Sequence, residues 1–157
     1  MARMRGPDRV RAALEAASLE CEIRTLPDST RTAVEAAAAV GCSVGEIAKS
    51  LVFRADDRAV VAIMSGDNRL DPARLAAALG EEVRRADADF VRAATGFAIG
   101  GVPPLGHATP ADVFMDRDLF RFDEIWAAAG SPYSVFAVEP ARLRDASGAT
   151  VMELKAG

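Results

Sequence analysis

Cysteine and histidine are scarce in this sequence, and their scarcity limits the kinds of site it can build. There are two cysteines, Cys21 and Cys42, and one histidine, His107. A structural zinc site takes a full set of Cys and His ligands at short, regular spacings, so we expect no metal site. No cofactor is expected either. Two cysteines in 157 residues indicate reduced thiols in a cytoplasmic protein rather than a disulfide framework.

Long apolar segments and an excess of positive charge are also absent. No stretch approaches the roughly 18 uncharged apolar residues that a membrane span needs, and no signal peptide is predicted. The net charge of −4 argues against a protein that coats nucleic acid by bulk electrostatics, so neither a membrane nor DNA is an expected partner. Four arginines near the N-terminus predict either a solvated helix face or a local phosphate-binding patch, namely Arg3, Arg5, Arg9 and Arg11.

The order of predicted elements indicates one α+β domain. Half of the residues are apolar, enough for a full hydrophobic core. Capping residues and helical spacing predict helices that begin near residues 7, 32, 71, 87, 122 and 140, and the fifth of these covers 122–129. Apolar runs predict strands over 21–26, 47–53, 59–64, near 83, and over 112–115, 133–138 and 150–154. Because helices and strands do not alternate strictly, a mixed sheet is expected.

Lys49 is the most informative single residue. A strand over 47–53 places it on one face with the large apolar side chains of Ile47, Leu51 and Phe53. Burial of an ammonium group is costly unless the group is paired or reaches water. Two interpretations follow: a lysine whose amine reaches solvent at the sheet edge, or a buried amine at a functional site.

Two glycine-containing segments could present backbone donors to a ligand. The first is a stiff loop, Gly100-Gly101-Val102-Pro103-Pro104-Leu105-Gly106. Its glycines permit close approach of a ligand to the main chain, and its remaining N–H groups could face an anion or a carbonyl oxygen. The second is Ser65-Gly66-Asp67-Asn68-Arg69, between a strand and a helix. Structural turns are the alternative interpretation of both.

Conventional catalytic sets fit this sequence badly. Cys42 and His107 would form the sole Cys/His pair, and nothing in the sequence brings them together. A Ser/His/Asp triad meets the same single-histidine problem. Asp112, Asp116 and Asp118 cluster, but the rim of a turn explains them equally well. If the protein is an enzyme, its substrate or water must therefore do part of the chemistry.

Taken together, these segments resemble the YbaK/ProX family of aminoacyl-tRNA deacylases, which includes the editing domain of bacterial prolyl-tRNA synthetases. The resemblance runs over residues 8–155. The matching pieces are Arg31-Thr32, Ala36-Ala37, Gly41, Ile47 to Phe53, Ser65-Gly66, Thr95-Gly96-Phe97, Gly100 to Gly106, Asp116, and Ala128 to Pro132. No single piece decides the matter, but the ordered set is specific.

The resemblance implies a mixed, barrel-like sheet flanked by helices, with a pocket between Lys49 and the glycine-rich loop. Lys49 would lie near the ester and the terminal ribose or phosphate of an aminoacyl-tRNA, and the backbone of Gly100, Gly101 and Val102 would hold the ester or stabilise its oxyanion. Water or a group of the substrate would attack. Substrate binding would fall to Arg31, Thr32, Ser65, Gly66, Pro103, Pro104, Gly106 and His107. The implied partners are the acceptor end of an aminoacyl-tRNA and prolyl-tRNA synthetase.

Two departures from the family pattern bear on the substrate. Cysteine-specific members carry Ser where this chain has Pro103, and basic residues where it has His107-Ala108-Thr109. The resemblance therefore favours alanyl- or 2-aminobutyryl-tRNA(Pro), with cysteinyl-tRNA(Pro) as the alternative. Two other classes stay open: a non-catalytic module that binds tRNA or a synthetase, and a hydrolase that uses Cys42.

Overall fold

The computed structural model describes residues 6–157, so Arg3 and Arg5 lie outside the described range. Its centre is a mixed sheet with the strand order β1-β7-β6-β2-β3-β5-β8, and β4 pairs with β2. The bounds are β1 Ile23–Thr25, β2 Ile47–Ala55, β3 Arg58–Ser65, β4 Arg84–Arg85, β5 Ala111–Asp116, β6 Ile125–Ala128, β7 Ser134–Val138 and β8 Thr150–Met152. The predicted α+β class with a mixed sheet is confirmed.

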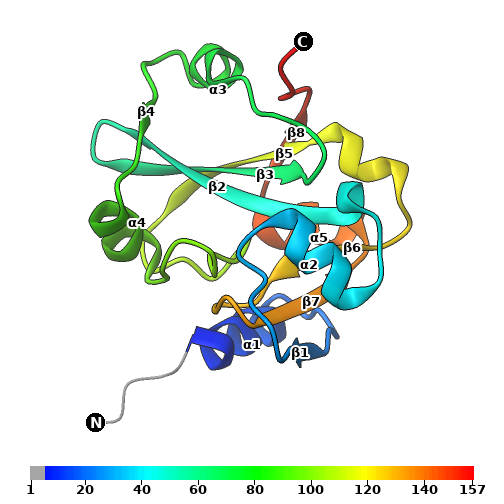
Figure 1. Ribbon diagram of the computed structural model, residues 1–157. Coiled ribbons are helices and arrows are strands. Elements are labelled where there is room, and N and C mark those ends of the chain that lie inside the picture. Colours follow the sequence, from blue (N-terminus) through cyan, green and yellow to red (C-terminus); the bar gives the residue numbers. More distant parts are fainter. Residues whose placement is uncertain (1–5) are drawn as a thin grey trace, which may run out of the picture.

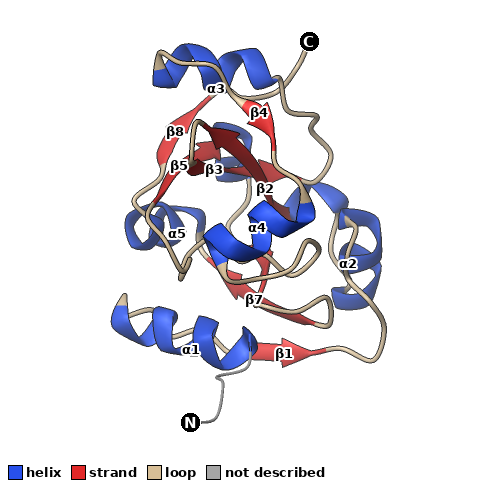
Figure 2. Ribbon diagram, turned by 90° about the vertical axis from the view of Figure 1, so that its left-hand side faces the viewer, coloured by secondary structure: helices blue, strands red, loops and turns tan. Residues whose placement is uncertain are grey.

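Helices flank this sheet (Figures 1 and 2). They are α1 Gly6–Ala16, α2 Ala33–Val40, α3 Pro72–Leu79, α4 Ala88–Thr95 and α5 Pro140–Ser147, with 3-10 turns η1 Val44–Glu46 and η2 Arg117–Arg121. Both views place α1 and α3 at opposite ends of the molecule. Within residues 6–157, no helix is both long enough and apolar enough to cross a membrane.

Helix α2 begins and ends where its sequence predicts. The Thr32 hydroxyl accepts a hydrogen bond from the Glu35 N–H at 3.1 Å, and the Glu35 carboxylate accepts one from the Thr32 N–H at 3.2 Å. This capping box satisfies two N–H groups that a helix start leaves unpaired. Gly41 ends the helix with φ 78°, a left-handed conformation that glycine adopts without strain.

The strands predicted over 47–53 and 59–64 are confirmed and pair as the β2–β3 hairpin, whereas the other side of β2 contains a gap. Antiparallel pairing runs without interruption from Ala55↔Arg58 to Ala48↔Ser65. On the opposite side, β6 pairs with Ile47 and Ala48, and β4 pairs with Phe53 and Arg54. Within the described chain, residues 49–52 therefore have no strand neighbour on that side.

The predicted helix over 122–129 is wrong, because this segment contains strand β6. Ile125, Ala127 and Ala129 are buried to 0–1% exposure, the alternation of a strand. β6 pairs in parallel with β2 and antiparallel with β7. The alanine-rich run favours a helix by local propensity, and pairing on both sides with its burial overrides that preference.

Arg9 ties α1 to the segment that follows α4, rather than lying on a solvated face. Its guanidinium group donates to the Gly96 carbonyl oxygen at 2.7 Å and stacks over the Phe97 ring, 4.6 Å from the centroid. Arg11 instead pairs with Asp8 on the surface. The contacts of Arg9 hold the segment that leads into the glycine-rich loop against the N-terminal helix.

Candidate functional site

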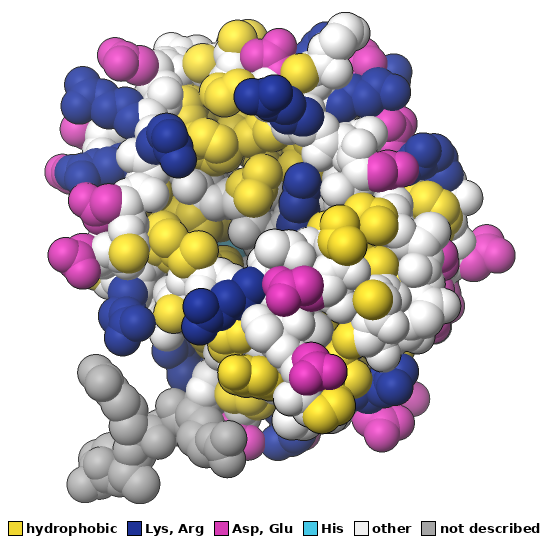
Figure 3. All heavy atoms as spheres, viewed as in Figure 1, with side chains coloured by type: hydrophobic (Ala, Val, Ile, Leu, Met, Phe, Trp, Pro, Cys, Tyr) yellow, Lys and Arg dark blue, Asp and Glu magenta, His cyan; other side chains and the backbone are white. Residues whose placement is uncertain are grey.

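A pocket of about 440 Å³ opens beside the gap in β2. Figure 3 shows a hollow on this face, bordered by apolar side chains and by Lys and Arg side chains. The walls come from β2, the start of α2, the loop after α4, and strands β6 and β7. Lining residues are Thr30, Arg31, Thr32, Ala33, Val34, Ala36, Ile47 to Leu51, Gly66, Ile99, Gly100, Val102, Trp126 to Ala128, and Val135.

Lys49 lines this pocket between Ile47 and Leu51 of its strand face, as the strand prediction required. Its side chain is half-buried. It forms no ion pair with residues 6–157, whereas the other lysine, Lys155, pairs with Asp118 at 3.3 Å. Lys49 therefore brings a positive charge to a largely apolar wall without a carboxylate partner in the described chain.

The loop 98–102 forms another wall of this pocket through Ile99, Gly100 and Val102. Gly100 has φ +94°, and a side chain on it would lie 3.0 Å from Cγ of Arg31, so both conformation and space require glycine there. No acceptor within residues 6–157 takes a hydrogen bond from the N–H of Gly100 or of Val102. These two residues and Lys49 line the same pocket.

Gly101 lies behind this wall and anchors it. Its N–H donates to the Ala98 carbonyl oxygen, and its own carbonyl oxygen accepts from the Gly130 N–H, both at 3.0 Å. A Cβ at this position would lie 2.8 Å from Cα of Ser131. Gly101 therefore joins the loop to the turn between β6 and β7, and its N–H group is already engaged.

The rest of the loop faces away from the pocket. Pro103 and Pro104 are buried, and Gly106 lies against Ala13 of α1, whose Cβ would be 2.9 Å from a Cβ at Gly106. The Nε2 atom of His107 is 2.8 Å from the Pro103 carbonyl oxygen. The structure thus separates these four predicted substrate-binding residues from Lys49.

His107 predicts a pH dependence of stability. Burial lowers the pKa of His107 below its ordinary value of 6.5, and the hydrogen bond with Pro103 offsets this in part. Because the unfolded chain binds the proton more readily, stability is complete above about pH 6.5 and is lost as the pH falls below that value. Urea unfolding between about pH 7.5 and 5.5 should show this slope, and His107→Asn should flatten it, since His107 is the single histidine. Equal slopes for the two proteins would contradict the assignment.

The predicted pair Ser65-Gly66 is split between two roles. Gly66 lines the pocket, and a Cβ on it would meet the Val44 carbonyl oxygen and Cβ of Ala33, so glycine allows α2 to approach. Ser65 is fully buried, and its Oγ lies 2.6 Å from the Gly45 carbonyl oxygen. Ser65 therefore does not line the pocket, and its role is to hold the chain next to Gly66 in place.

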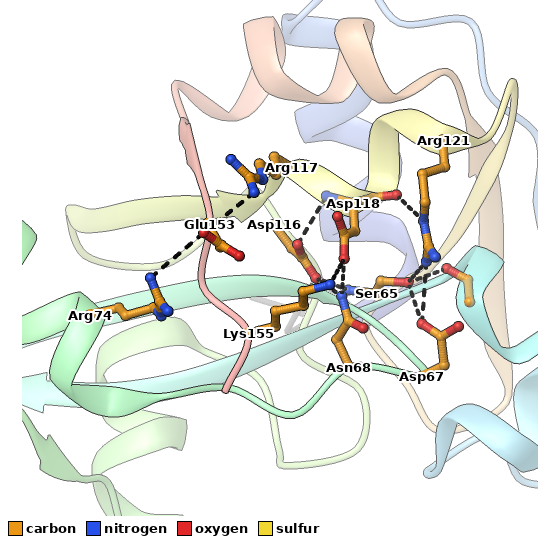
Figure 4. A network of polar contacts seen from close by, with 11 residues as sticks. Ser65, Asp67, Asn68, Arg74, Asp116, Arg117, Asp118, Arg121, Glu153 and Lys155 are labelled. Atoms are coloured by element: carbon orange, nitrogen blue, oxygen red, sulfur yellow. Dashed lines mark hydrogen bonds and ion pairs between the residues drawn. The ribbon is translucent and has the colours of Figure 1, made fainter. Parts of the chain in front are cut away.

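A buried carboxylate organises the same junction (Figure 4). Asp116 is 1% exposed and accepts hydrogen bonds from the Ser65 N–H, the Asn68 amide and the Asp118 N–H, at 2.8–3.1 Å. Asn68 and Lys155 also lower the pKa of Asp118 by hydrogen bonding to its carboxylate. Asp112 lies away from this network and pairs with Arg58. The three aspartates are therefore not one cluster.

Cys42 has surroundings unsuited to a nucleophile. Burial raises the pKa of its thiol above the ordinary value, whereas a reactive cysteine needs a lowered one. It does not line the pocket. Among residues 6–157, no group of three or more His, Cys, Asp or Glu side chains is placed to hold a metal ion.

Comparison with known proteins assigns the chain to a family. The family model of the aminoacyl-tRNA editing domain matches residues 27–146, most of the chain. This chain belongs to the aminoacyl-tRNA editing domain family. The editing domain is 33% identical over 129 residues to the uncharacterized protein YwhH of Bacillus subtilis (strain 168), covering 82% of each chain. It is 34% identical over 109 residues to proline–tRNA ligase 1 of Anaeromyxobacter dehalogenans (strain 2CP-C), covering 68% of this chain and 19% of the ligase.

Solved structures share the whole fold of this editing domain. A proposed trans-editing enzyme for prolyl-tRNA synthetase matches with a TM-score of 0.93 and 44% identity, covering 99% of this chain and 100% of that chain. The hypothetical protein APE2540 matches with a TM-score of 0.87 and 29% identity, covering 94% and 99%. The predicted family is therefore confirmed. The editing domain spans only 16–21% of the proline–tRNA ligases that it matches.

Proposed function

We propose that this editing domain, over residues 8–155, is a trans-acting deacylase that hydrolyses the ester of mischarged tRNA(Pro). The favoured substrates are alanyl- and 2-aminobutyryl-tRNA(Pro). One observation carries the proposal: Lys49 lines the same pocket as Gly100 and Val102, whose N–H groups have no hydrogen-bond acceptor within residues 6–157. The matches to proline–tRNA ligases support the choice of tRNA(Pro).

The proposed chemistry is electrostatic stabilisation of an attacked ester. When water attacks the ester carbon, with the free ribose hydroxyl of the substrate relaying its proton, negative charge develops on the ester carbonyl oxygen; the bond to the esterified ribose oxygen then breaks, that oxygen takes up the proton, and the free amino acid is released. The N–H groups of Gly100 and Val102 and the ammonium group of Lys49 stabilise that charge in a partly desolvated pocket. Gly101 keeps the loop in place, and no side-chain nucleophile of the protein takes part.

The mouth of the pocket suits a polyanion. Arg31 and Thr32 stand at the entrance, and the stem of Arg31 packs over Gly100 with its guanidinium group on the surface. Arginine binds phosphate in a bidentate manner, and α2 begins at this point. We assign Arg31 to a phosphate of the tRNA acceptor end.

The amino-acid side chain is assigned to the apolar part of the pocket. Ile47, Ala127 and Val135 line it, and Trp126 lies beside them. Such a wall suits a methyl or ethyl group. Because Pro103 and His107 lie behind the loop, the preference for alanine or 2-aminobutyrate rests on this lining, and cysteine is the second choice.

A panel of mischarged tRNA(Pro) tests the proposal directly. The purified protein should hydrolyse alanyl- or 2-aminobutyryl-tRNA(Pro) well above the buffer rate, cysteinyl-tRNA(Pro) more slowly, and prolyl-tRNA(Pro) least. Measurable tRNA binding without turnover of any ester would show that the protein is a non-catalytic binding module and not a deacylase. Inactivation of the protein by thiol alkylation would restore Cys42 as the candidate nucleophile.

A further inference from the structure

A second cavity adjoins the pocket on the far side of the loop wall. It measures about 230 Å³ and shares five lining residues with the first, namely Ser50, Leu51, Ile99, Gly100 and Val102. Its other walls are Val52, Phe53, Arg85, Ala86 and Val91. The second cavity therefore lies along the unpaired stretch of β2, between β6 and β4, and meets the first at Gly100 and Val102.

The edge of β2 offers a paired donor and acceptor to this cavity. A two-residue turn closes the hairpin at Ala55↔Arg58, so Ala55 and every second residue before it bond to β3. The peptide groups of Ser50 and Val52 therefore point away from β3, into the gap. The Ser50 carbonyl oxygen and the Val52 N–H lie next to each other along that edge. The buried Ser50 hydroxyl also lacks a hydrogen-bond partner within residues 6–157.

The side walls are apolar with one cation. Leu51, Phe53, Val91 and Ile99 contribute apolar surface, and Ile99 is 58% exposed at the wall that the two cavities share. Arg85 lines the cavity and makes no ion pair with residues 6–157, whereas its neighbour Arg84 contacts Glu82 at 3.6 Å and lies outside the cavity. A flat, neutral, apolar group with a polar edge fits such walls.

We propose that this second cavity binds the terminal adenine of the tRNA. The Watson–Crick edge of adenine places an N–H donor, the 6-amino group, beside the acceptor N1, which complements the Ser50 carbonyl oxygen and the Val52 N–H. The guanidinium group of Arg85 stacks on the base. This inference rests on the proposed function: with adenine here, the ester reaches the shared wall at Gly100 and Val102, and the amino-acid side chain enters the first pocket.

Adjacent arginines give a matched pair of protein variants. Arg85→Gln should raise KM for an alanyl minihelix about tenfold and leave kcat nearly unchanged, because the contact is to the bound base rather than to the reacting ester. Arg84→Gln removes the same charge one residue away and should change neither constant by more than about twofold. Equal effects of the two substitutions would show a general charge effect and overturn the assignment.

Substrates altered at the terminal base test the edge contacts. Alanyl minihelices ending in purine riboside or 1-deazaadenosine each lack one hydrogen bond and should lose about two- to tenfold in kcat/KM. With an abasic terminal nucleotide, Arg85→Gln should cause no further loss. Full activity on the abasic substrate would overturn the proposal, and so would an undiminished Arg85→Gln effect on it.

A titration with free AMP separates the two sources of adenine. AMP should inhibit the wild-type protein competitively and more strongly than CMP, and Arg85→Gln should weaken the inhibition. If AMP inhibits but the deacylation rate does not depend on the terminal base of the substrate, the cavity binds a free nucleotide and the proposal is overturned. Absence of deacylation by the wild-type protein would refute the proposed function itself. A deacylation rate that depends neither on the terminal base of the substrate nor on Arg85 would refute this inference alone.

Discussion

Replacing Lys49 by alanine is expected to lower kcat for deacylation of the best mischarged tRNA(Pro) by at least about a hundredfold, the usual effect of removing one group that stabilises developing charge. The side chain makes no ion pair with residues 6–157 and is half-buried in the pocket wall. Its removal therefore leaves no buried partner unpaired, and stability should change little. Single-turnover kinetics with a thermal melt of the same sample would measure both quantities.

Lys155→Ala is the matched control, since it removes the other lysine, which pairs with Asp118 on the far side of β3. It should retain nearly full activity. Lys49→Arg should recover part of the lost rate, because it restores the charge but not the compact ammonium geometry. An active Lys49→Ala protein would show that the loop acts without the amine, and the proposed chemistry would fail.

Asp116→Ala is expected to cause the largest loss of stability, about 3 kcal/mol or more in the free energy of unfolding. The carboxylate is buried and accepts three hydrogen bonds, two of them from the backbone N–H groups of Ser65 and Asp118. Removing it leaves these donors without an acceptor, at a cost of about 1–3 kcal/mol for each buried group. Urea unfolding at pH 7.5 would measure the change.

Asp112→Ala gives the comparison within the same strand. The Asp112 side chain is 43% exposed and pairs with Arg58 at the surface, so its loss should shift the unfolding midpoint far less. If both substitutions lower the free energy of unfolding equally, the hydrogen bonds around Asp116 do not stabilise the junction between β3 and η2. Because Gly66 follows Ser65 directly, Asp116→Ala should also weaken substrate binding at temperatures where the protein stays folded.

Local signals in the sequence predicted most of the fold. Thr32 with Glu35 and Asp71 with Pro72 predicted correct helix starts, and Gly41 and Gly80 predicted correct helix ends, because capping depends on neighbouring residues alone. Gly130 was wrongly predicted to end a helix, since it follows strand β6. Strand β6 was missed, since Ile125 to Ala128 becomes a strand through pairing with two distant segments. The alternation of Ile125, Ala127 and Ala129 before a Gly-Ser-Pro turn is the signal that could have identified it.

The candidate site was predicted in part for the same reason. The strand period placed Lys49 among apolar neighbours, and the loop glycines indicated close backbone approach. Nothing in the sequence distinguished Gly100, which faces the pocket, from Gly101, whose N–H group is engaged. The pocket residues of β6 and the exposed Val34 and Ile99 at the pocket were missed, because they gather there only through the topology of the sheet.

The N-terminal helix packs against the glycine-rich loop and the segment before it. Arg9 donates to the Gly96 carbonyl oxygen, and Ala13 packs on Gly106, so α1 contacts both the segment before the loop and the last glycine of the loop. The family match begins at residue 27, after this helix. A loop that is immobilised before substrate arrives surrenders little conformational entropy on binding, so its donors are preorganised. We therefore expect substitutions in α1 to change the rate of the proposed reaction, although α1 contributes no residue to the pocket lining.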